Sequence, residues 1–264
     1  MALKRKKFLS ILYLVLFVVT VGGLGAFRLG RHSSEKPVAV KPGIFRVRNL
    51  FTDLYGARIG DQAVLFDAGV DEAGAALDVL LGALSVARDQ VEHVFLTHGH
   101  FDHVAAAPLC TRAKIHVGAP DVELMAHRVR AEPLMPRMMG HIFAVPAIES
   151  NAPFGGPTAI PLANGKELFA TPLPGHTPGS YLLVYDGVMF AGDALQIDGD
   201  KLDFAISLFS SDMDADRRGV AGLKNALGGR VIDTVCTGHQ GCTPAGKGGA
   251  MLDDLIARAV AAQH

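Results

Sequence analysis

The sequence of 264 residues has no tryptophan, only four tyrosines and only three cysteines. It therefore has little material for the aromatic platforms on which single-stranded nucleic acid stacks. Acidic residues are absent from residues 1–32, which hold six basic ones, so the rest of the chain carries 19 basic against 26 acidic side chains. This remainder has a net charge of −7 and lacks the basic surface that binds a phosphate backbone, so we predict no nucleic-acid partner.

The N-terminal basic residues precede a long uncharged run. Lys4–Lys7 are followed by the twenty uncharged residues Phe8–Phe27, which as a helix would be about 30 Å long and span a bilayer core. A cleaved signal peptide usually has a shorter apolar run, and a buried core helix is usually interrupted by polar residues. We therefore predict a cytoplasmic N-terminus at residues 1–7 and a single-pass transmembrane helix at residues 8–27.

This topology would place everything after the helix outside the cytoplasm, which is the periplasm in a Gram-negative cell. If the segment were instead cleaved as a signal peptide, the protein would be secreted. Residues 28–43 are predicted to be a tether, because their central stretch is polar, contains two prolines and offers nothing to bury. Residues 44–264 are predicted to form one domain.

In that domain, short apolar strands alternate with segments of helical spacing, which predicts a layered α/β fold. The predicted strands cover Ile44–Asn49, Tyr55–Ile59, Ala63–Phe66, Val91–Leu96, Lys114–Val117, Leu168–Thr171, Ser180–Tyr185, Val188–Phe190 and Val231–Cys236. The predicted helices cover Ala73–Leu84, Asp121–Arg130 with Asp121 as its cap, a segment from Ser211 or Asp212 to Leu227, and Ala250–Ala262. Asp186-Gly187 is typical of a hairpin turn between two strands.

A dense cluster of histidines follows the strand Val91–Leu96. His98, His100, Asp102 and His103 lie within six residues. Three crowded imidazoles would repel one another if protonated, and each needs a hydrogen-bond partner if neutral. A divalent cation removes both difficulties, because neutral imidazole and carboxylate are ligands that Zn²⁺ prefers. The cluster therefore predicts a metal site.

This cluster resembles the His-x-His-x-Asp-His signature of the metallo-β-lactamase-fold hydrolases. Further family elements follow in order: Asp67 after a strand, His176 in Gly175-His176-Thr177-Pro178-Gly179, Asp193 in Gly192-Asp193, and His239 in Gly238-His239. The resemblance covers residues 44–264 and implies an αββα sandwich of two sheets flanked by helices. It also places the site at one rim of the sandwich.

The resemblance further implies a dinuclear zinc site. His98, His100 and His176 would hold one ion, and Asp102, His103 and His239 the second, with Asp193 bridging both. A hydroxide held between the ions would be the nucleophile, because bound zinc lowers the pKa of water to about 7. Asp102, besides binding metal, would orient that hydroxide, so Asp102 and Asp193 are the predicted catalytic carboxylates.

The family pattern also narrows the substrate. Zinc β-lactamases usually have Cys or Ser where this chain has Asp193, whereas a bridging Asp resembles hydrolases of the glyoxalase II type, lactonases and phosphodiesterases. Glyoxalase II carries a longer helical region after the last ligand than the 25 residues that follow His239. The expected activity is hydrolysis of a small ester, lactone or thioester. Two alternatives stay open: a mononuclear iron dioxygenase acting on persulfides, and a metal-binding domain without catalysis.

Two other features bear on the site. The stretch Leu134–Pro157 combines methionines and phenylalanines with prolines and is interpreted as a loop that either walls a substrate pocket or packs on the domain. Cys236 and Cys242 are close enough in sequence to pair around His239, but an odd cysteine count favours free, buried thiols. The remaining histidines lack a motif and are predicted to be structural or exposed: His93, His116, His127, His141 and His264.

Overall fold

The computed structural model describes residues 34–263. One six-stranded sheet contains, in spatial order, β1 (Val38–Lys41), β2 (Ile44–Asn49), β3 (Thr52–Ile59), β4 (Gln62–Phe66), β5 (Val91–Phe95) and β6 (Lys114–His116). A five-stranded sheet contains β13 (Thr234–Thr237), β10 (Val188–Gly192), β9 (Tyr181–Tyr185), β8 (Glu167–Pro172) and β7 (Thr158–Pro161). A separate ribbon pairs β11 (Leu195–Asp198) with β12 (Lys201–Phe204). Both larger sheets mix parallel and antiparallel pairs.

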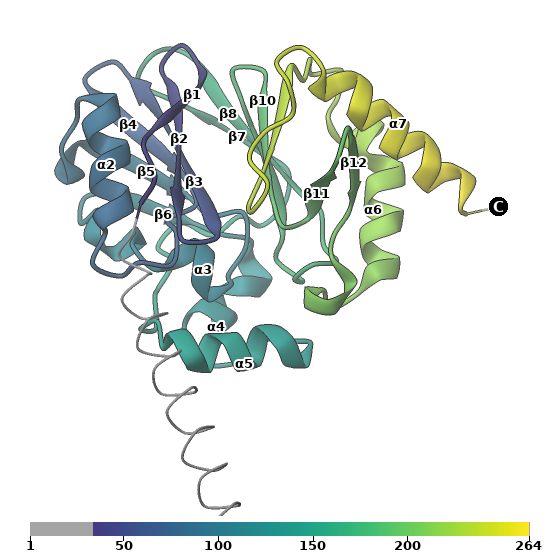
Figure 1. Ribbon diagram of the computed structural model, residues 1–264, viewed down its shortest axis with the longest axis horizontal. Coiled ribbons are helices and arrows are strands. Elements are labelled where there is room, and N and C mark those ends of the chain that lie inside the picture. The colour runs from purple at the N-terminus through teal and green to yellow at the C-terminus, as the bar shows by residue number, and fades with distance from the viewer. Residues whose placement is uncertain (1–33, 264) are drawn as a thin grey trace, which may run out of the picture.

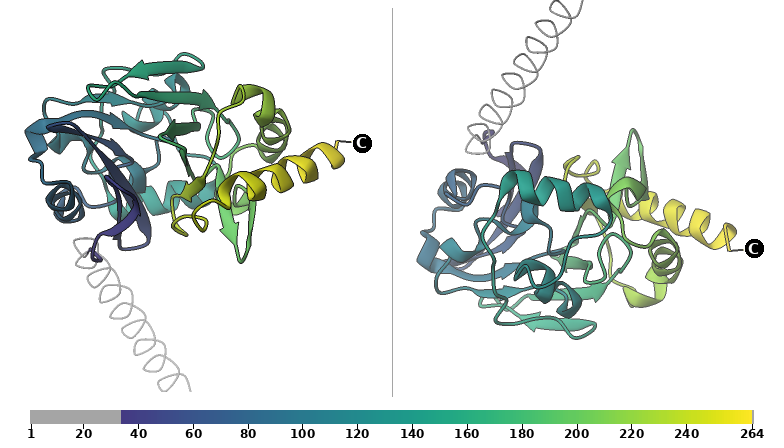
Figure 2. Two further views of the ribbon diagram at one scale, coloured as in Figure 1. Left: turned by 90° about the horizontal axis from the view of Figure 1, so that it is seen from above. Right: turned by 90° about the horizontal axis from the view of Figure 1, so that it is seen from below.

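Helices α2 (Ala75–Leu84), α6 (Met213–Ala226) and α7 (Gly248–Ala261) lie on the outer sides of the two facing sheets, whereas α5 (Leu134–Phe143) lies below their lower edge in the view of Figure 1 (see also Figure 2). Two further α-helices are α3 (Phe101–Val104) and α4 (Val122–Met125). Short 3₁₀ turns add η1 (Arg88–Gln90), η2 (Ala107–Leu109), η3 (Ala119–Asp121) and η4 (Ser207–Phe209). Helix α2 packs on the six-stranded sheet, while α6 and α7 pack on the other, so the predicted αββα order is present in the described residues.

Strand alternation divides the apolar side chains among three cores. In β4, Val64 and Phe66 face the space between the sheets, whereas Leu65 faces α2. Phe66 stacks on Phe190 of β10 with ring centroids 3.8 Å apart, joining the two sheets at their centre. Apolar side chains thus hold the two sheets together. The polar side chains described below lie mostly in the loops at the strand ends.

Three sequence predictions need correction. The predicted tether reaches too far, because Val38–Lys41 forms β1, an edge strand that pairs with β2 through its backbone and needs little burial. The predicted helix Asp121–Arg130 is only four residues long, and the Asp121 side chain does not cap it. The stretch Leu134–Pro157, predicted to be a loop, begins with the ten-residue helix α5.

The cysteines also differ from the predicted free thiols. Cys236 and Cys242 form a disulfide, the alternative to free thiols that the sequence leaves open. Cys110 is free and buried, and burial raises the pKa of its thiol to about 12. Among residues 34–263, no helix is both long and apolar enough to cross a bilayer. The predicted transmembrane segment, residues 8–27, lies outside the described residues.

Candidate metal centre

The structure brings all seven predicted ligand side chains together at one end of the sandwich. They come from the segment after β5, from α3 and from the turns after β8, β10 and β13: His98, His100, Asp102, His103, His176, Asp193 and His239. The loops that follow these strands all lie at the same end of the sandwich. His98 and His239, which are 141 positions apart in sequence, therefore belong to one cluster. Asp193 and His239 keep side-chain exposures of 16% and 23%, whereas the other five are nearly closed to solvent.

The first group consists of His98, His100 and His176. The Nε2 atom of His176 lies 3.2 Å from Nε2 of His98 and 2.9 Å from Nδ1 of His100. Burial lowers the pKa of His98 and His176 well below the usual value, helped by the neighbouring imidazoles, and lowers that of His100 to about 4. The group is therefore made of neutral imidazoles at neutral pH.

Hydroxyl groups determine which nitrogen of His98 and His176 carries the proton. The Thr97 hydroxyl donates to the Asp67 carboxylate, and the Ser210 hydroxyl donates to the Ile206 carbonyl. A hydroxyl has one hydrogen to give, so Thr97 must accept from Nδ1 of His98 and Ser210 from Nδ1 of His176. Both Nε2 atoms then carry lone pairs, and they face each other with no proton between them.

The second group, Asp102, His103 and His239, is oriented in the same way. His103 Nδ1 lies 2.8 Å from the Asp67 carboxylate, and His239 Nδ1 lies 2.9 Å from the Phe51 carbonyl. Each Nδ1–H therefore has an acceptor, and each Nε2 is directed into the cluster. Such partners for the far nitrogen of a histidine are typical of metal ligands.

Two carboxylates complete the cluster. Oδ2 of Asp193 lies 2.9 Å from His239 Nε2 and 3.6 Å from His176 Nε2, and Oδ1 lies 3.4 Å from His103 Nε2. Asp193 thus reaches members of both groups, whereas the ion-pair contacts of Asp102 are with His103 and His239 of the second group. Burial alone would lower the pKa of His239, but the Asp193 carboxylate outweighs it and raises this pKa to about 9.

Two buried polar atoms that face into the cluster lack a hydrogen-bond partner among the described residues: His103 Nε2 and Asp193 Oδ1. Converging lone pairs and carboxylate oxygens that leave such atoms unpaired are costly without a cation. The imidazole and carboxylate donors also fit the ligand preferences of divalent transition metals. The arrangement could hold two cations, with Asp193 between them.

Asp121 links the two loops of the first group. Its fully buried carboxylate accepts hydrogen bonds from the Gly99 and Gly179 backbone amides and from the Thr177 hydroxyl. Burial raises the pKa of Asp121, although these hydrogen bonds oppose the shift. Because its oxygens are committed to these two loops, Asp121 does not serve as the helix cap that the sequence suggested.

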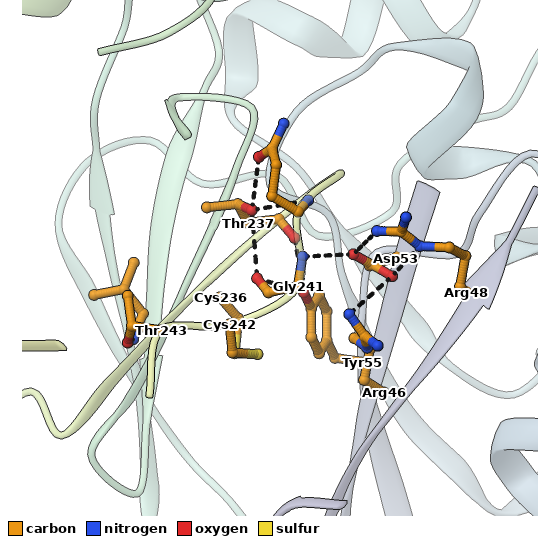
Figure 3. The surroundings of a disulfide bond; sticks show 11 residues. Arg46, Arg48, Asp53, Tyr55, Cys236, Thr237, Gly241, Cys242 and Thr243 are labelled. Carbon is orange, nitrogen blue, oxygen red and sulfur yellow. Dashed lines mark hydrogen bonds and ion pairs between the residues drawn. A yellow bond between two sulfur atoms is a disulfide. The ribbon is translucent and has the colours of Figure 1, made fainter. Parts of the chain in front are cut away.

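The loop that carries His239 is held from the opposite sheet (Figure 3). Asp53 of β3 accepts a hydrogen bond from the Gly241 amide at 2.8 Å and pairs with Arg48, which also donates to the His239 carbonyl. The Tyr55 hydroxyl donates to the Thr237 carbonyl at 2.7 Å. The disulfide of Cys236 and Cys242 closes this loop at its base. The His239 backbone is therefore tied down on both sides.

The sequence predicts the seven clustered side chains but not most of the residues that support them. Asp67 follows a strand and belongs to the resemblance, so it could be named, whereas Ser210, Asp121 and Asp53 carry no motif. The histidines predicted to lie outside the site do so within the described residues. His93 and His116 contact each other in the interior, and His127 and His141 are exposed. His264 lies outside the described residues.

Comparisons with solved structures agree with this architecture. A metallo-beta-lactamase from Cronobacter sakazakii superposes with a TM-score of 0.65 at 16% identity, over 90% of this chain and 96% of that one. A metallo-beta-lactamase family protein from Thermus thermophilus gives a TM-score of 0.61 at 18% identity, over 84% of this chain and 81% of that one. At these identities the likeness concerns the fold.

Sequence comparisons add a family and two distant relatives. A hydroxyacylglutathione hydrolase from Anaeromyxobacter dehalogenans is 28% identical over 136 residues, which are 52% of this chain and 43% of that protein. The uncharacterized protein YobT of Bacillus subtilis is 32% identical over 118 residues, 41% of this chain and 48% of that protein. The chain thus matches less than half the length of either relative. The family description "Metallo-beta-lactamase superfamily" matches residues 50–239, the segment that contains all seven clustered side chains, and the chain belongs to this superfamily.

Proposed function

We propose that the protein is a dinuclear zinc hydrolase that cleaves a small ester, lactone or thioester. The observation that carries this proposal is the position of Asp193, whose two oxygens reach histidines of both groups. Imidazole and carboxylate donors of this kind suit zinc. The distant relative named hydroxyacylglutathione hydrolase supports hydrolysis as the class of reaction.

Two zinc ions bound here would polarise a substrate carbonyl and make a shared water acidic enough to attack near neutral pH. The chain's own residues set up that chemistry. Thr97 and Ser210 keep His98 and His176 in the tautomer that presents Nε2, and Asp67 does the same for His103. Asp102, which accepts a hydrogen bond from Thr52 at 3.2 Å, presents a carboxylate that can hold and orient an attacking water.

The test is metal analysis of the full chain purified without added metal, followed by hydrolysis assays. We expect two zinc ions per chain, loss of ester, lactone or thioester hydrolysis on chelation, and recovery when zinc is added. One iron per chain with oxygen uptake would instead favour the dioxygenase. Protein that binds two metals but cleaves nothing in a broad panel of esters, lactones, thioesters and phosphodiesters would contradict the proposal.

We also propose that residues 8–27 anchor the protein in the cell membrane, with the metal centre outside the cytoplasm. The uncharged run after Lys4–Lys7 supports this placement. The native chain is expected to stay with membranes after a carbonate wash, to keep its N-terminus, and to be cut by protease added to spheroplasts. Soluble protein that begins near residue 27 would show a cleaved signal peptide instead.

A further inference from the structure

A cavity of about 270 Å³ is lined in part by the clustered His and Asp side chains. Its lining includes clustered side chains such as His176, Asp193 and His239, and the rest of the lining, called the wall below, is mostly apolar. That wall consists of Phe51, Phe101, Pro136, Met139, Leu195, Ile206 and Phe209, with the amides of Gln196 and Gln240 as its polar members. Reactive groups beside an apolar wall are the usual form of a site for a small organic molecule.

Aromatic packing holds the apolar wall in place. Phe143, at the end of α5, is buried and stacks on Phe101 with ring centroids 4.8 Å apart. It also meets the Phe51 ring edge-on at 5.6 Å, and Phe51 in turn stacks on His239. Helix α5 is thus held against Phe51 and Phe101, which line the cavity, and its own Pro136 and Met139 line the cavity as well.

The apolar character continues to the surface around the cavity. Ile206, which lines the cavity, is 37% exposed, and Leu208 of η4 is 56% exposed. The exposed Leu134 and Met138 of α5 lie on a different face of that helix from Pro136 and Met139. Helix α5 and η4 lie against each other. The mostly apolar lining of the cavity, with Ile206 partly exposed, favours a role in binding an apolar group.

The charges of the side chains that line the cavity favour an uncharged substrate over an anionic one. Among the described residues that line it there is no lysine or arginine, and its charged groups are all predicted metal ligands. Arg130 and Arg137 line a neighbouring cavity, which shares three lining residues with this one: His100, Phe101 and Pro136. Arg137 is paired there with Glu132. A carboxylate or phosphate on the far part of a substrate would therefore lose hydration on entering without gaining a counter-charge.

We infer that the substrate is an uncharged ester, lactone or thioester whose acyl group is a long apolar chain lying along the α5–η4 wall. The inference rests on the proposed hydrolase function. In the reaction, water adds its oxygen to the acyl carbon, the bond from that carbon to the ester oxygen or thioester sulfur breaks, and the leaving group takes a proton. Each methylene that is fully buried against the wall should strengthen substrate binding by about fourfold, and a partly buried one by less.

The experiment uses the full chain loaded with zinc and p-nitrophenyl esters of acetate, butyrate, hexanoate and octanoate. We expect kcat/KM to rise by about thirtyfold or more from acetate to octanoate, since six methylenes at even twofold each exceed that value. The matching octanoate ester with a carboxylate at the far end of its chain should be at least about tenfold poorer than octanoate. A flat series, or a preference for the carboxylated ester, would overturn the inference and leave hydrolysis standing.

A charge introduced into the wall tests the same idea in the protein. Met139→Lys should reduce the preference for octanoate and improve cleavage of the carboxylated ester, because the new ammonium supplies the missing counter-charge. Gln196→Lys should supply the same counter-charge from β11. Gln196 is polar and half-buried, so this position should tolerate lysine more readily than Met139 does. Met138→Lys, at an exposed position of the same helix as Met139 that does not line the cavity, is the matched control and should leave the ratio of the two esters unchanged. If neither Met139→Lys nor Gln196→Lys changes kcat/KM for either ester, the wall does not bind the acyl chain. If the unmodified protein cleaves none of the esters, the hydrolase proposal itself is contradicted.

Discussion

Replacing Asp193 with alanine is expected to abolish hydrolysis and to remove more bound metal than replacing Asp102 with alanine. Asp193 lies within 3.6 Å of histidine nitrogens from both groups, whereas the ion-pair contacts of Asp102 are with His103 and His239 of the second group. Loss of a group that merely supports a ligand typically costs 10–100-fold in affinity or activity. Loss of a carboxylate shared by two ions should therefore lower kcat/KM by more than about 100-fold.

Metal content and kcat/KM are measured together on Asp193→Ala, Asp102→Ala and the exposed control Asp198→Ala. The control removes a surface carboxylate of the ribbon after β10 and should keep two metals and full activity. Asp102→Ala should lose metal mainly from the second group. An Asp193→Ala protein that keeps both metals and full activity would show that the two groups do not share this carboxylate.

The parts of the site that could be predicted from sequence are those whose evidence is local. His98, His100, Asp102 and His103 lie within six residues, so their spacing alone indicates a metal site. Single residues such as Asp193 and His239 follow strands but needed the family pattern to be recognised. Strand positions were also predictable in places, because four of the five residues of β4, Ala63–Phe66, form a consecutive apolar run, and all four are buried.

What could not be predicted depends on contacts between distant segments. Ser210 acts on His176 from 34 positions away, and Asp53 holds the Gly241 amide across 188 positions. A serine before a helix and an aspartate in a strand have many local explanations, and nothing in their neighbourhood marks them as supports. The disulfide was left open for a related reason: the pairing of Cys236 with Cys242 depends on the path of the loop between them.

Asp121 is the support whose loss should have the widest effect. Asp121→Ala would leave three buried donors, the Gly99 and Gly179 amides and the Thr177 hydroxyl, without their acceptor. Each such group costs about 1–3 kcal/mol, so the free energy of unfolding should fall by about 3 kcal/mol or more. Because Gly99 lies between His98 and His100, and Thr177 follows His176, metal affinity of the first group should fall by about 10–100-fold.

The matched control for this prediction is Asp71→Ala. Asp71 is also buried, and its carboxylate also accepts backbone hydrogen bonds, from Ala73 at 2.9 Å and Ala75 at 2.7 Å, at the start of α2. Its loss should lower the free energy of unfolding without changing zinc affinity, whereas Asp121→Ala should change both. Urea unfolding of the metal-free proteins and zinc titration of the folded ones separate the two quantities. Equal zinc affinities in the two variants would mean that Asp121 stabilises the fold but does not position the ligand loops.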